Sequence, residues 1–310
     1  MPTLLISHPA CLDHITPSGH PERPDRLRVV ERILEHERFQ TLAREQAPMA
    51  DLETVALCHP LDYVEQVRDV SPKEGMVRLD ADTTMSPGTF EAAMRAVGGS
   101  VLAVDEVMTG KVRNAFVATR PPGHHAETAR PMGFCLFNHA AIAARYAQRK
   151  HGAERACIVD FDVHHGNGSQ DIFWSDPSVM YCSTHQMPLY PGTGAPSERG
   201  EFNTIVNAPL RPGDGGPEFR AAMENVILPR LRDFRPDIVV ISAGFDAHMN
   251  DPLGGLNFTE ADFAWATKAL MALADETAGG RIVSVLEGGY DLDGLANSVA
   301  AHVIALMGAA

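Results

Sequence analysis

The sequence predicts an α/β fold in which helices cover both faces of a parallel sheet. Short runs that are apolar throughout recur along the chain and alternate with longer segments of helical periodicity. Strands that are apolar throughout belong in a sheet that is buried on both faces. The 310 residues contain no repeat, low-complexity tract or obvious linker. We therefore expect one domain spanning residues 1–310.

Six runs have the length and composition of buried strands. The expected strands are Leu4–Ser7, Ala115–Thr119, Ala156–Asp162, Val179–Ser183, Ile238–Ser242 and Ile282–Leu286. Apolar residues recur with helical spacing between them, and the expected helices cover roughly 22–36, 89–109, 137–149, 216–233, 259–275 and 291–307. Ligands bind beyond the carboxyl ends of the strands in such sheets, so functional residues are expected in the loops that follow these strands.

The composition disfavours several classes of protein. An apolar fraction of 45% supports a sizeable core, and no run approaches the roughly 20 apolar residues of a membrane-spanning helix. The net charge of −14 disfavours a nucleic-acid partner; it either attracts cationic substrates or only keeps the protein soluble. Five scattered cysteines without a CxxC pair, and an N-terminus without a signal-peptide pattern, lead us to expect a cytoplasmic protein.

Four of the expected strands run into loops rich in polar residues and glycine. The loops are "RPPGHHAETARPMGFC" (120–135), "DVHHGNG" (162–168), "AGFDAHMNDPLGG" (243–255) and "EGGYDLDG" (287–294). Charged groups at the end of a buried strand must be paired, bound to metal or left in solvent. Because parallel strands end at the same edge of a sheet, we expect the four loops to converge.

Asp162 and His164 are separated by one residue, and alternate residues of an extended chain face the same way. They could therefore hold one ion, with Asp246 from another loop as the leading third ligand. One histidine and two carboxylates suit Zn²⁺ or Fe²⁺, with positions left open for water and substrate. The alternative is a strand end that is capped by hydrogen bonds and binds no metal.

His124 and His125 are adjacent, so their side chains diverge and suit two roles better than one shared ion. One would act as general base toward a water molecule at the metal, and the other as an electrostatic or acid partner. Each needs an orienting group on its far ring nitrogen, and Asp160 and Asn167 are the candidates. The alternative is that these are structural histidines bound to loop carbonyls.

Three aromatic residues lie in glycine-rich loops. Tyr290 follows two glycines, and its phenol could polarise a carbonyl and stabilise an oxyanion. Phe134 and Tyr190 could form the walls of a narrow channel for an aliphatic chain. Taken alone, each of the three is better explained as an ordinary packed side chain.

Taken together, these segments resemble the signature blocks of the histone deacetylase superfamily. The blocks are "GHPERPDRL" (19–27), "DADTTMSPGTFEAA" (80–93), "RPPGHHA", "GFCLFNHAA", "VDFDVHHGNG", "LYPGTG", "AGFDAHMNDPLGG" and "LEGGYDL". They occur in the family's order over residues 8 to about 295, nearly the whole chain. The pattern is most similar to class II-like bacterial deacetylases, which are similar to acetylpolyamine amidohydrolases.

The resemblance implies the arginase/deacetylase fold, with a central parallel sheet of about eight strands flanked by helices, and one catalytic Zn²⁺ per chain. It implies Asp162, His164 and Asp246 as the zinc ligands. It implies the catalytic residues His124, His125, Asp160, Asn167 and Tyr290. It places around the substrate Phe134, Tyr190, Gly133, Leu253, Gly288 and, at the rim, Asp82. It also places Arg26 beside an internal channel for acetate release.

The resemblance further implies a structural potassium ion, held mostly by backbone oxygens. The residues around it would be Asp160, Asp162, His164, Ser183 and Thr184. Nothing in the sequence decides the number of subunits, and a homo-oligomer is compatible with it.

The expected activity is zinc-dependent hydrolysis that removes an acetyl or related acyl group from an amine nitrogen of the acetyl-lysine type. One alternative is an acetylpolyamine deacetylase; Leu253 stands where polyamine-selective relatives tend to place an acidic residue, which favours acyl-lysine mildly. A ureohydrolase of the same fold would need two Mn²⁺ and more bridging carboxylates. A non-catalytic module that binds acyl-amines should have lost a ligand, a histidine or the tyrosine, and none is missing.

Overall fold

The computed structural model describes residues 1–308 and is built around one sheet of eight strands. The strand order is β2-β1-β5-β10-β9-β6-β7-β8, and every neighbouring pair is parallel. The strands are β1 Thr3–Ser7, β2 Ala43–Gln46, β5 Asn114–Val117, β6 Ala156–Asp160, β7 Val179–Gln186, β8 Ile205–Leu210, β9 Ile238–Ala243 and β10 Ile282–Leu286. The predicted fold class is confirmed, and the single domain over residues 1–310 stays a prediction.

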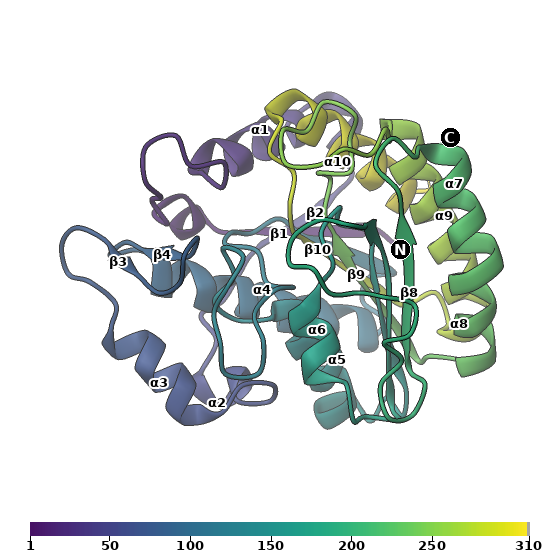
Figure 1. The fold of residues 1–310 in the computed structure, drawn as a ribbon, viewed down its shortest axis with the longest axis horizontal. Coiled ribbons are helices and arrows are strands. Elements are labelled where there is room, and N and C mark those ends of the chain that lie inside the picture. Colours follow the sequence, from purple (N-terminus) through teal and green to yellow (C-terminus); the bar gives the residue numbers. More distant parts are fainter. Residues whose placement is uncertain (309–310) are drawn as a thin grey trace.

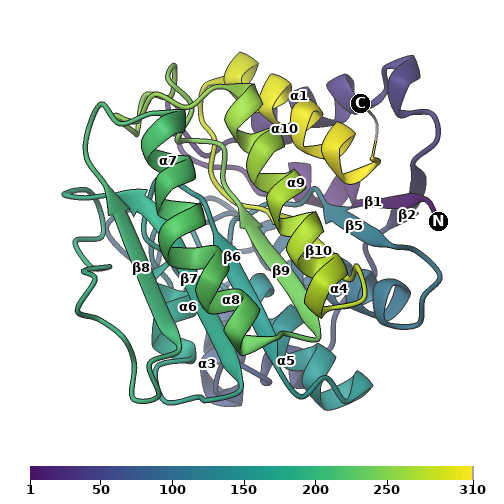
Figure 2. The same ribbon diagram turned by 90° about the vertical axis from the view of Figure 1, so that its right-hand side faces the viewer.

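Helices lie on both faces of the sheet (Figure 1). They are α1 Pro24–Leu34, α2 Leu52–Val55, α3 Leu61–Asp69, α4 Thr89–Met108, α5 His139–His151, α6 Asn167–Ile172, α7 Gly216–Ala222, α8 Leu228–Phe234, α9 Glu260–Thr277 and α10 Leu292–Leu306. Figure 2 shows α7, α8, α9 and α10 side by side over one face. α4 and α5 pack together against the other face.

Two apolar cores flank the sheet because successive strand residues point to opposite faces. In β9, Val239 and Ile241 belong to the core under α9 and α10, whereas Ile238 and Val240 belong to the core under α4 and α5. All four side chains are fully buried. This two-sided burial explains why the predicted strands read as continuous apolar runs.

Local signals set several helix ends. The Asn138 side chain accepts a hydrogen bond from Ala141 N at the start of α5, and Gly152 ends that helix with φ of 70°. The Asp291 side chain caps α10 through Gly294 N at 2.7 Å. Asn138 and Asp291 adjoin the polar loops 120–135 and 287–294, so the N-terminal caps of α5 and α10 help to fix these loops in place.

The structure differs from the predicted elements at the sheet edges, in one helix and at the end of β6, and it contains the helices α2, α3 and α6, which were not predicted. β2 and β8, the two edge strands, were not predicted because β2 exposes Arg44, Glu45 and Gln46, and β8 contains Pro209. The helix expected over 216–233 is divided into α7 and α8 by a π-helical turn at Met223–Ile227. The strand expected over Ala156–Asp162 ends at Asp160.

A separate two-stranded antiparallel ribbon, β3 (Val77–Arg78) and β4 (Thr84–Met85), lies outside the main sheet. The turn between these strands carries Asp82 and Thr83. Among the helices that the structure describes, none is long and apolar enough to cross a membrane.

Candidate active site

The four polar loops follow β5, β10, β9 and β6, which are neighbours in the middle of the sheet. Their carboxyl ends therefore meet at one edge. The loop after β5 carries the adjacent histidines, the loop after β6 carries Asp162 and His164, the loop after β9 carries Asp246, and the loop after β10 carries Tyr290. The predicted convergence of these loops is what the structure shows.

Asp162, His164 and Asp246 form a buried trio whose ligand atoms all lie within 4.8 Å of one another. His164 Nδ1 lies 3.1 Å from Asp162 Oδ1 and 3.1 Å from Asp246 Oδ2. The remaining carboxylate oxygens are held by backbone N–H groups. Val163 N donates to Asp246 Oδ1 at 2.8 Å, and Gly288 N donates to Asp162 Oδ2 at 2.8 Å.

Asp162 and His164 were predicted to face the same way because they would lie in an extended strand. This reason was wrong. β6 ends two residues before Asp162, and the chain then bends. The bend is held by the Asp162 side chain, whose Oδ1 accepts a hydrogen bond from His164 N at 2.9 Å. This turn, closed by the Asp162 side chain, brings the His164 ring next to the Asp162 carboxylate.

The electrostatics of the trio suit a divalent cation. Burial alone would lower the pKa of His164, but its hydrogen bonds to Asp162 and Asp246 raise that pKa to about 10. Burial and the neighbouring Asp162 charge raise the pKa of Asp246 to about 7. A proton is therefore retained where three ligand atoms converge, and a metal ion would take its place. Two oxygens and one nitrogen are a suitable donor set for zinc with open positions.

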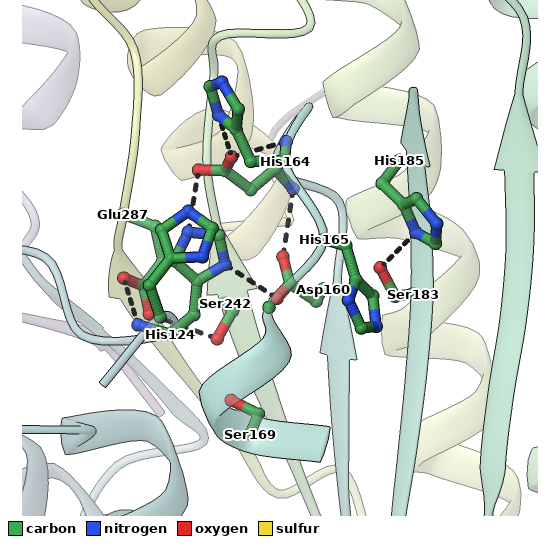
Figure 3. Close-up of polar contacts among 12 residues, drawn as sticks. His124, Asp160, His164, His165, Ser169, Ser183, His185, Ser242 and Glu287 are labelled. Carbon is green, nitrogen blue, oxygen red and sulfur yellow. Dashed lines mark hydrogen bonds and ion pairs between the residues drawn. The ribbon is translucent and has the colours of Figure 1, made fainter. Parts of the chain in front are cut away.

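His124 is buried behind the trio and is held by Asp160. His124 Nδ1 lies 3.0 Å from Asp160 Oδ2, which also accepts a hydrogen bond from the Tyr181 hydroxyl at 3.0 Å. His124 Nε2 lies 3.7 Å from Asp162 Oδ2 (Figure 3). Burial alone would lower the pKa of His124, but Asp162 and Asp160 raise it well above the ordinary value. Asp160 and Asp162 therefore favour the protonated form of His124 beside the trio.

His125 is oriented by a chain of hydrogen bonds. Asn167 Nδ2 donates to Glu127 Oε1 at 2.8 Å, which turns Asn167 Oδ1 toward His125 Nδ1 at 2.8 Å. The ring proton must then sit on His125 Nδ1, which leaves Nε2 as a proton acceptor. Burial, with the nearby His124 and His164, lowers the pKa of His125 well below its ordinary value.

A cavity of about 260 Å³ opens from the trio to the surface. The predicted site residues that line it are His125, Tyr290, Gly133, Phe134, Tyr190, Leu253 and Asp82, together with His164. Tyr190 lies at its outer part with 39% of its surface exposed. Gly288 lies deeper, where a Cβ atom would overlap the carboxylates of Asp162 and Asp246.

The wall residue Phe134 has a left-handed backbone, with φ of 68°. Two residues of the β3–β4 turn hold this conformation. Asp82 Oδ1 accepts a hydrogen bond from Gly133 N at 3.0 Å, and Thr83 Oγ1 accepts one from Phe134 N at 3.1 Å. Asp82, predicted to bind substrate backbone at the rim, thus also fastens the wall of the cavity.

Tyr290 lines the cavity and lies beside Arg26. The Arg26 guanidinium stacks over the phenol ring at 4.8 Å from its centre. It also donates to the backbone oxygens of Gly289 and Glu287, which fixes the loop after β10. Arg26 is fully buried; its expected place beside an acetate channel stays a prediction.

The residues predicted around potassium lie on the paired strands β6 and β7 and the loop that follows β6. Asp160 and Ser183 are directly opposite in the parallel register. The Ser183 hydroxyl is engaged by His185 Nδ1 at 2.8 Å, whereas the buried Thr184 hydroxyl has no hydrogen-bond partner among residues 1–308. These contacts leave the potassium site a prediction.

Several polar residues of the site were missed from the sequence. Tyr181, Asp251 and Glu287 each bind loops or side chains of the site from buried positions. Asp251 and Glu287 accept hydrogen bonds from backbone N–H groups of loops, and the Tyr181 hydroxyl bonds Gly166 N and Asp160 Oδ2. Contacts of this kind leave no spacing pattern in the sequence. Glu287 had one available signal, because it follows the apolar run of β10 directly.

The fold and the site now allow comparison with known proteins. The family model for the histone deacetylase domain matches residues 20–306. The chain belongs to the histone deacetylase family. Membership in the histone deacetylase family confirms the resemblance predicted from the sequence blocks, and supports deacetylase activity.

Relatives and a solved structure match nearly the whole chain. "Histone deacetylase 10, chloroplastic" of Oryza sativa subsp. japonica is 40% identical over 310 residues, covering 94% of this chain and 70% of the relative. "Probable deacetylase" of Archaeoglobus fulgidus is 39% identical over 317 residues, covering 99% and 86%. The crystal structure of the HDA15 HD domain superposes with a TM-score of 0.95 at 37% identity, covering 100% of this chain and 89% of that chain.

Proposed function

We propose that this protein is a zinc-dependent hydrolase that removes an acetyl or related acyl group from a primary amine of the acetyl-lysine type. One observation carries the proposal. His125 and Tyr290 line the same cavity as His164, which is one member of the buried Asp162–His164–Asp246 trio. Ligands, a base and an electrophile are therefore available to the same bound group.

The residues divide the chemistry as follows. Zinc held by the trio would polarise the acyl carbonyl and make a water molecule more acidic. His125 Nε2 takes a proton from that water and later gives a proton to the leaving amine nitrogen. The Tyr290 hydroxyl donates a hydrogen bond to the developing oxyanion. His124, held by Asp160, adds positive charge beside the trio.

The shape of the cavity supports an extended aliphatic substrate. Phe134, Tyr190, Leu189 and Leu253 provide apolar walls between the surface and the trio. Apolar walls with a few polar groups at the base are typical of sites that bind a chain and react at its end. The methylene chain of an acylated lysine fits this description.

Acetylated polyamines are the second candidate substrate, because they also present an acyl group on an aliphatic chain. The net charge of −14 would favour cationic molecules of this kind. Leu253 in the cavity wall favours the lysine-type substrate, since it provides no carboxylate to pair with a second amine.

A panel of substrates tests the proposal. The zinc-loaded protein is assayed with acetyl-lysine peptides and with acetylated putrescine, cadaverine and spermidine, and zinc per chain is measured. We expect hydrolysis of the peptides, with inhibition by hydroxamates, which chelate zinc at an open position. Preference for acetylated polyamines would select the second candidate. Failure to hydrolyse any acetylated amine, or no inhibition at millimolar hydroxamate, would contradict the proposal.

The structural potassium ion and a cytoplasmic location complete the proposal. The five cysteines are free and buried, which is compatible with a reducing compartment.

A further inference from the structure

Glu287 is a fully buried carboxylate at the base of the loop that carries Tyr290. Its Oε2 accepts hydrogen bonds from Gly123 N at 2.7 Å and from His124 N at 3.2 Å. Its Oε1 accepts a hydrogen bond from the Ser242 hydroxyl at 3.2 Å. Figure 3 shows the carboxylate between the backbone of the histidine loop and the Ser242 side chain on β9.

Nothing of opposite charge pairs with this carboxylate directly. Within residues 1–308, no arginine or lysine forms an ion pair with it, and Arg26 reaches only its backbone oxygen. Burial raises the pKa of Glu287 to about 7. Keeping a carboxyl group in such a place is costly, and the nearby His124 offsets this cost together with the backbone N–H donors of the histidine loop.

The opposite side of this loop is closely packed. A Cβ atom at Gly123 would lie 2.7 Å from Cδ2 and 2.9 Å from Nε2 of His139, and 2.9 Å from Phe137 O. The backbone at Gly123 is therefore held between the ring of His139 and the carboxylate of Glu287. A shift of this backbone would carry the His124 ring away from Asp160 Oδ2, which is 3.0 Å distant.

We propose that Glu287 is a positioning residue, whose carboxylate fixes the backbone of the histidine loop relative to the loop that carries Tyr290. The two loops come from adjacent strands, β5 and β10, and supply the base and the electrophile. Misplacement of a reacting group by about 1 Å can cost about 10²-fold in rate. The kinetic part of this inference rests on the proposed function; the structural part does not.

Three variants separate position from charge. In Glu287→Gln, the amide oxygen can still accept from both N–H groups, and the amide NH₂ can donate to the Ser242 hydroxyl. Glu287→Ala removes every one of these contacts. Ser242→Ala is the matched control, because it removes the hydrogen bond of the Glu287 side chain that does not involve the histidine loop.

Each variant is measured for kcat, KM, zinc content and amide hydrogen exchange of the segment 120–126. For Glu287→Ala we expect kcat to fall about 10²-fold, with KM and zinc content little changed and with faster exchange in this segment. Glu287→Gln should recover most of kcat and the slow exchange. Ser242→Ala should resemble the wild type in both.

Two results would overturn the inference. If Glu287→Gln is as impaired as Glu287→Ala, the charge and not the position of the loop is what matters. If Glu287→Ala keeps slow exchange in segment 120–126, the loop is fixed by other contacts. A wild-type protein without deacetylase activity would refute the proposed function instead, and hydrogen exchange would still decide this inference. If Glu287→Ala does not fold, kcat and hydrogen exchange of Glu287→Gln and Ser242→Ala are compared instead. Values close to wild type in both variants support the inference, and a large loss in Glu287→Gln alone overturns it.

Discussion

The carboxylate of Asp251 accepts a hydrogen bond from the backbone N–H of Tyr290 at 2.7 Å. The same oxygen accepts from Asp291 N at 3.2 Å, and the other oxygen accepts from Leu253 N at 2.9 Å. One side chain thus connects Tyr290, a wall of the cavity and the loop that carries Asp246. The position of Tyr290 depends on the loop after β9 as well as on its own loop.

Asp251 should not tolerate replacement by asparagine. Both of its oxygens face N–H donors, so the amide NH₂ of Asp251→Asn would face a donor whichever way it turns. We expect the free energy of unfolding to fall by about 1–3 kcal/mol, measured by urea denaturation, and kcat to fall with it. Asp293→Asn, an exposed acid in the first turn of α10, is the control and should change neither. Wild-type stability of Asp251→Asn would show that this contact is dispensable.

Loss of the Tyr290 hydroxyl should affect kcat far more than binding. In Tyr290→Phe we expect kcat to fall by at least about 100-fold, because one donor to an oxyanion typically contributes 10²–10³. KM and zinc content should change little, since the ring that stacks on Arg26 remains. Steady-state kinetics on the best substrate check this. A near-normal kcat would show that Tyr290 contributes only packing.

The trio should bind about one zinc ion per chain. Removal of zinc by a chelator should abolish activity, and added zinc should restore it. Asp246→Ala should lose the ion, because it removes one of three ligands and leaves His164 with one carboxylate. Elemental analysis measures this, with the exposed Asp233→Ala as control. Two metal ions per chain, or full occupancy in Asp246→Ala, would contradict it.

Leu253 should influence the choice between substrates. In Leu253→Glu, a carboxylate at the cavity wall would pair with a second amine of an acetylated polyamine. Partly exposed ion pairs contribute up to about 1 kcal/mol, so we expect kcat/KM for acetylated spermidine to rise about fivefold relative to an acetyl-lysine peptide. Leu253→Gln has nearly the same size without the charge and should show no such shift. An equal effect of both variants would rule out ion pairing as the cause.

Glu22 should make the stability of the fold sensitive to acid. It is fully buried and contacts Arg120, Arg26 Nη1 at 3.1 Å and His14 Nε2 at 3.2 Å. Burial alone would raise the pKa of Glu22, but Arg120 and His14 hold it well below the ordinary value. A carboxylate with a lowered pKa in the folded state contributes stability above its unfolded pKa. That contribution is lost as the pH falls through the folded pKa.

Glu22→Gln measures this contribution. At neutral pH the variant should be less stable by about 3–5 kcal/mol, because two buried guanidinium groups lose their anionic partner. The difference from wild type should stay constant above about pH 4.5 and shrink below it by up to about 1.4 kcal/mol per pH unit. Denaturation at several pH values tests this, with Asp25→Asn, at a half-exposed position, as control. A difference that grows as the pH falls would have the wrong sign.

The sequence predicted the middle of the sheet well and its edges poorly. β6, β9 and β10 are apolar on both faces, which makes their runs unmistakable. The edge strand β2 is four residues long and largely exposed, so its sequence carries no such signal. The convergence of the loops followed from strand ends alone, and needed no knowledge of side-chain contacts.

The residues that hold the site together were harder to predict than the histidines and the trio. His124 and His125 are adjacent and Asp162 and His164 are separated by one residue, so each pair is visible in the sequence. Asp251 and Glu287 instead bind backbone N–H groups of distant loops, and any loop offers such groups. Only the folded chain shows which loop each carboxylate reaches.

The central position of β10 has a consequence for how the protein is made. β10 pairs with β5 on one side and with β9 on the other, although it is the last strand of the described chain to be synthesised. Until it emerges from the ribosome, the inner edges of β5 and β9 have no partner in the finished order, and unpaired apolar edges invite aggregation. The nascent chain thus has reason to depend on chaperones until β10, Ile282–Leu286, takes its place in the sheet.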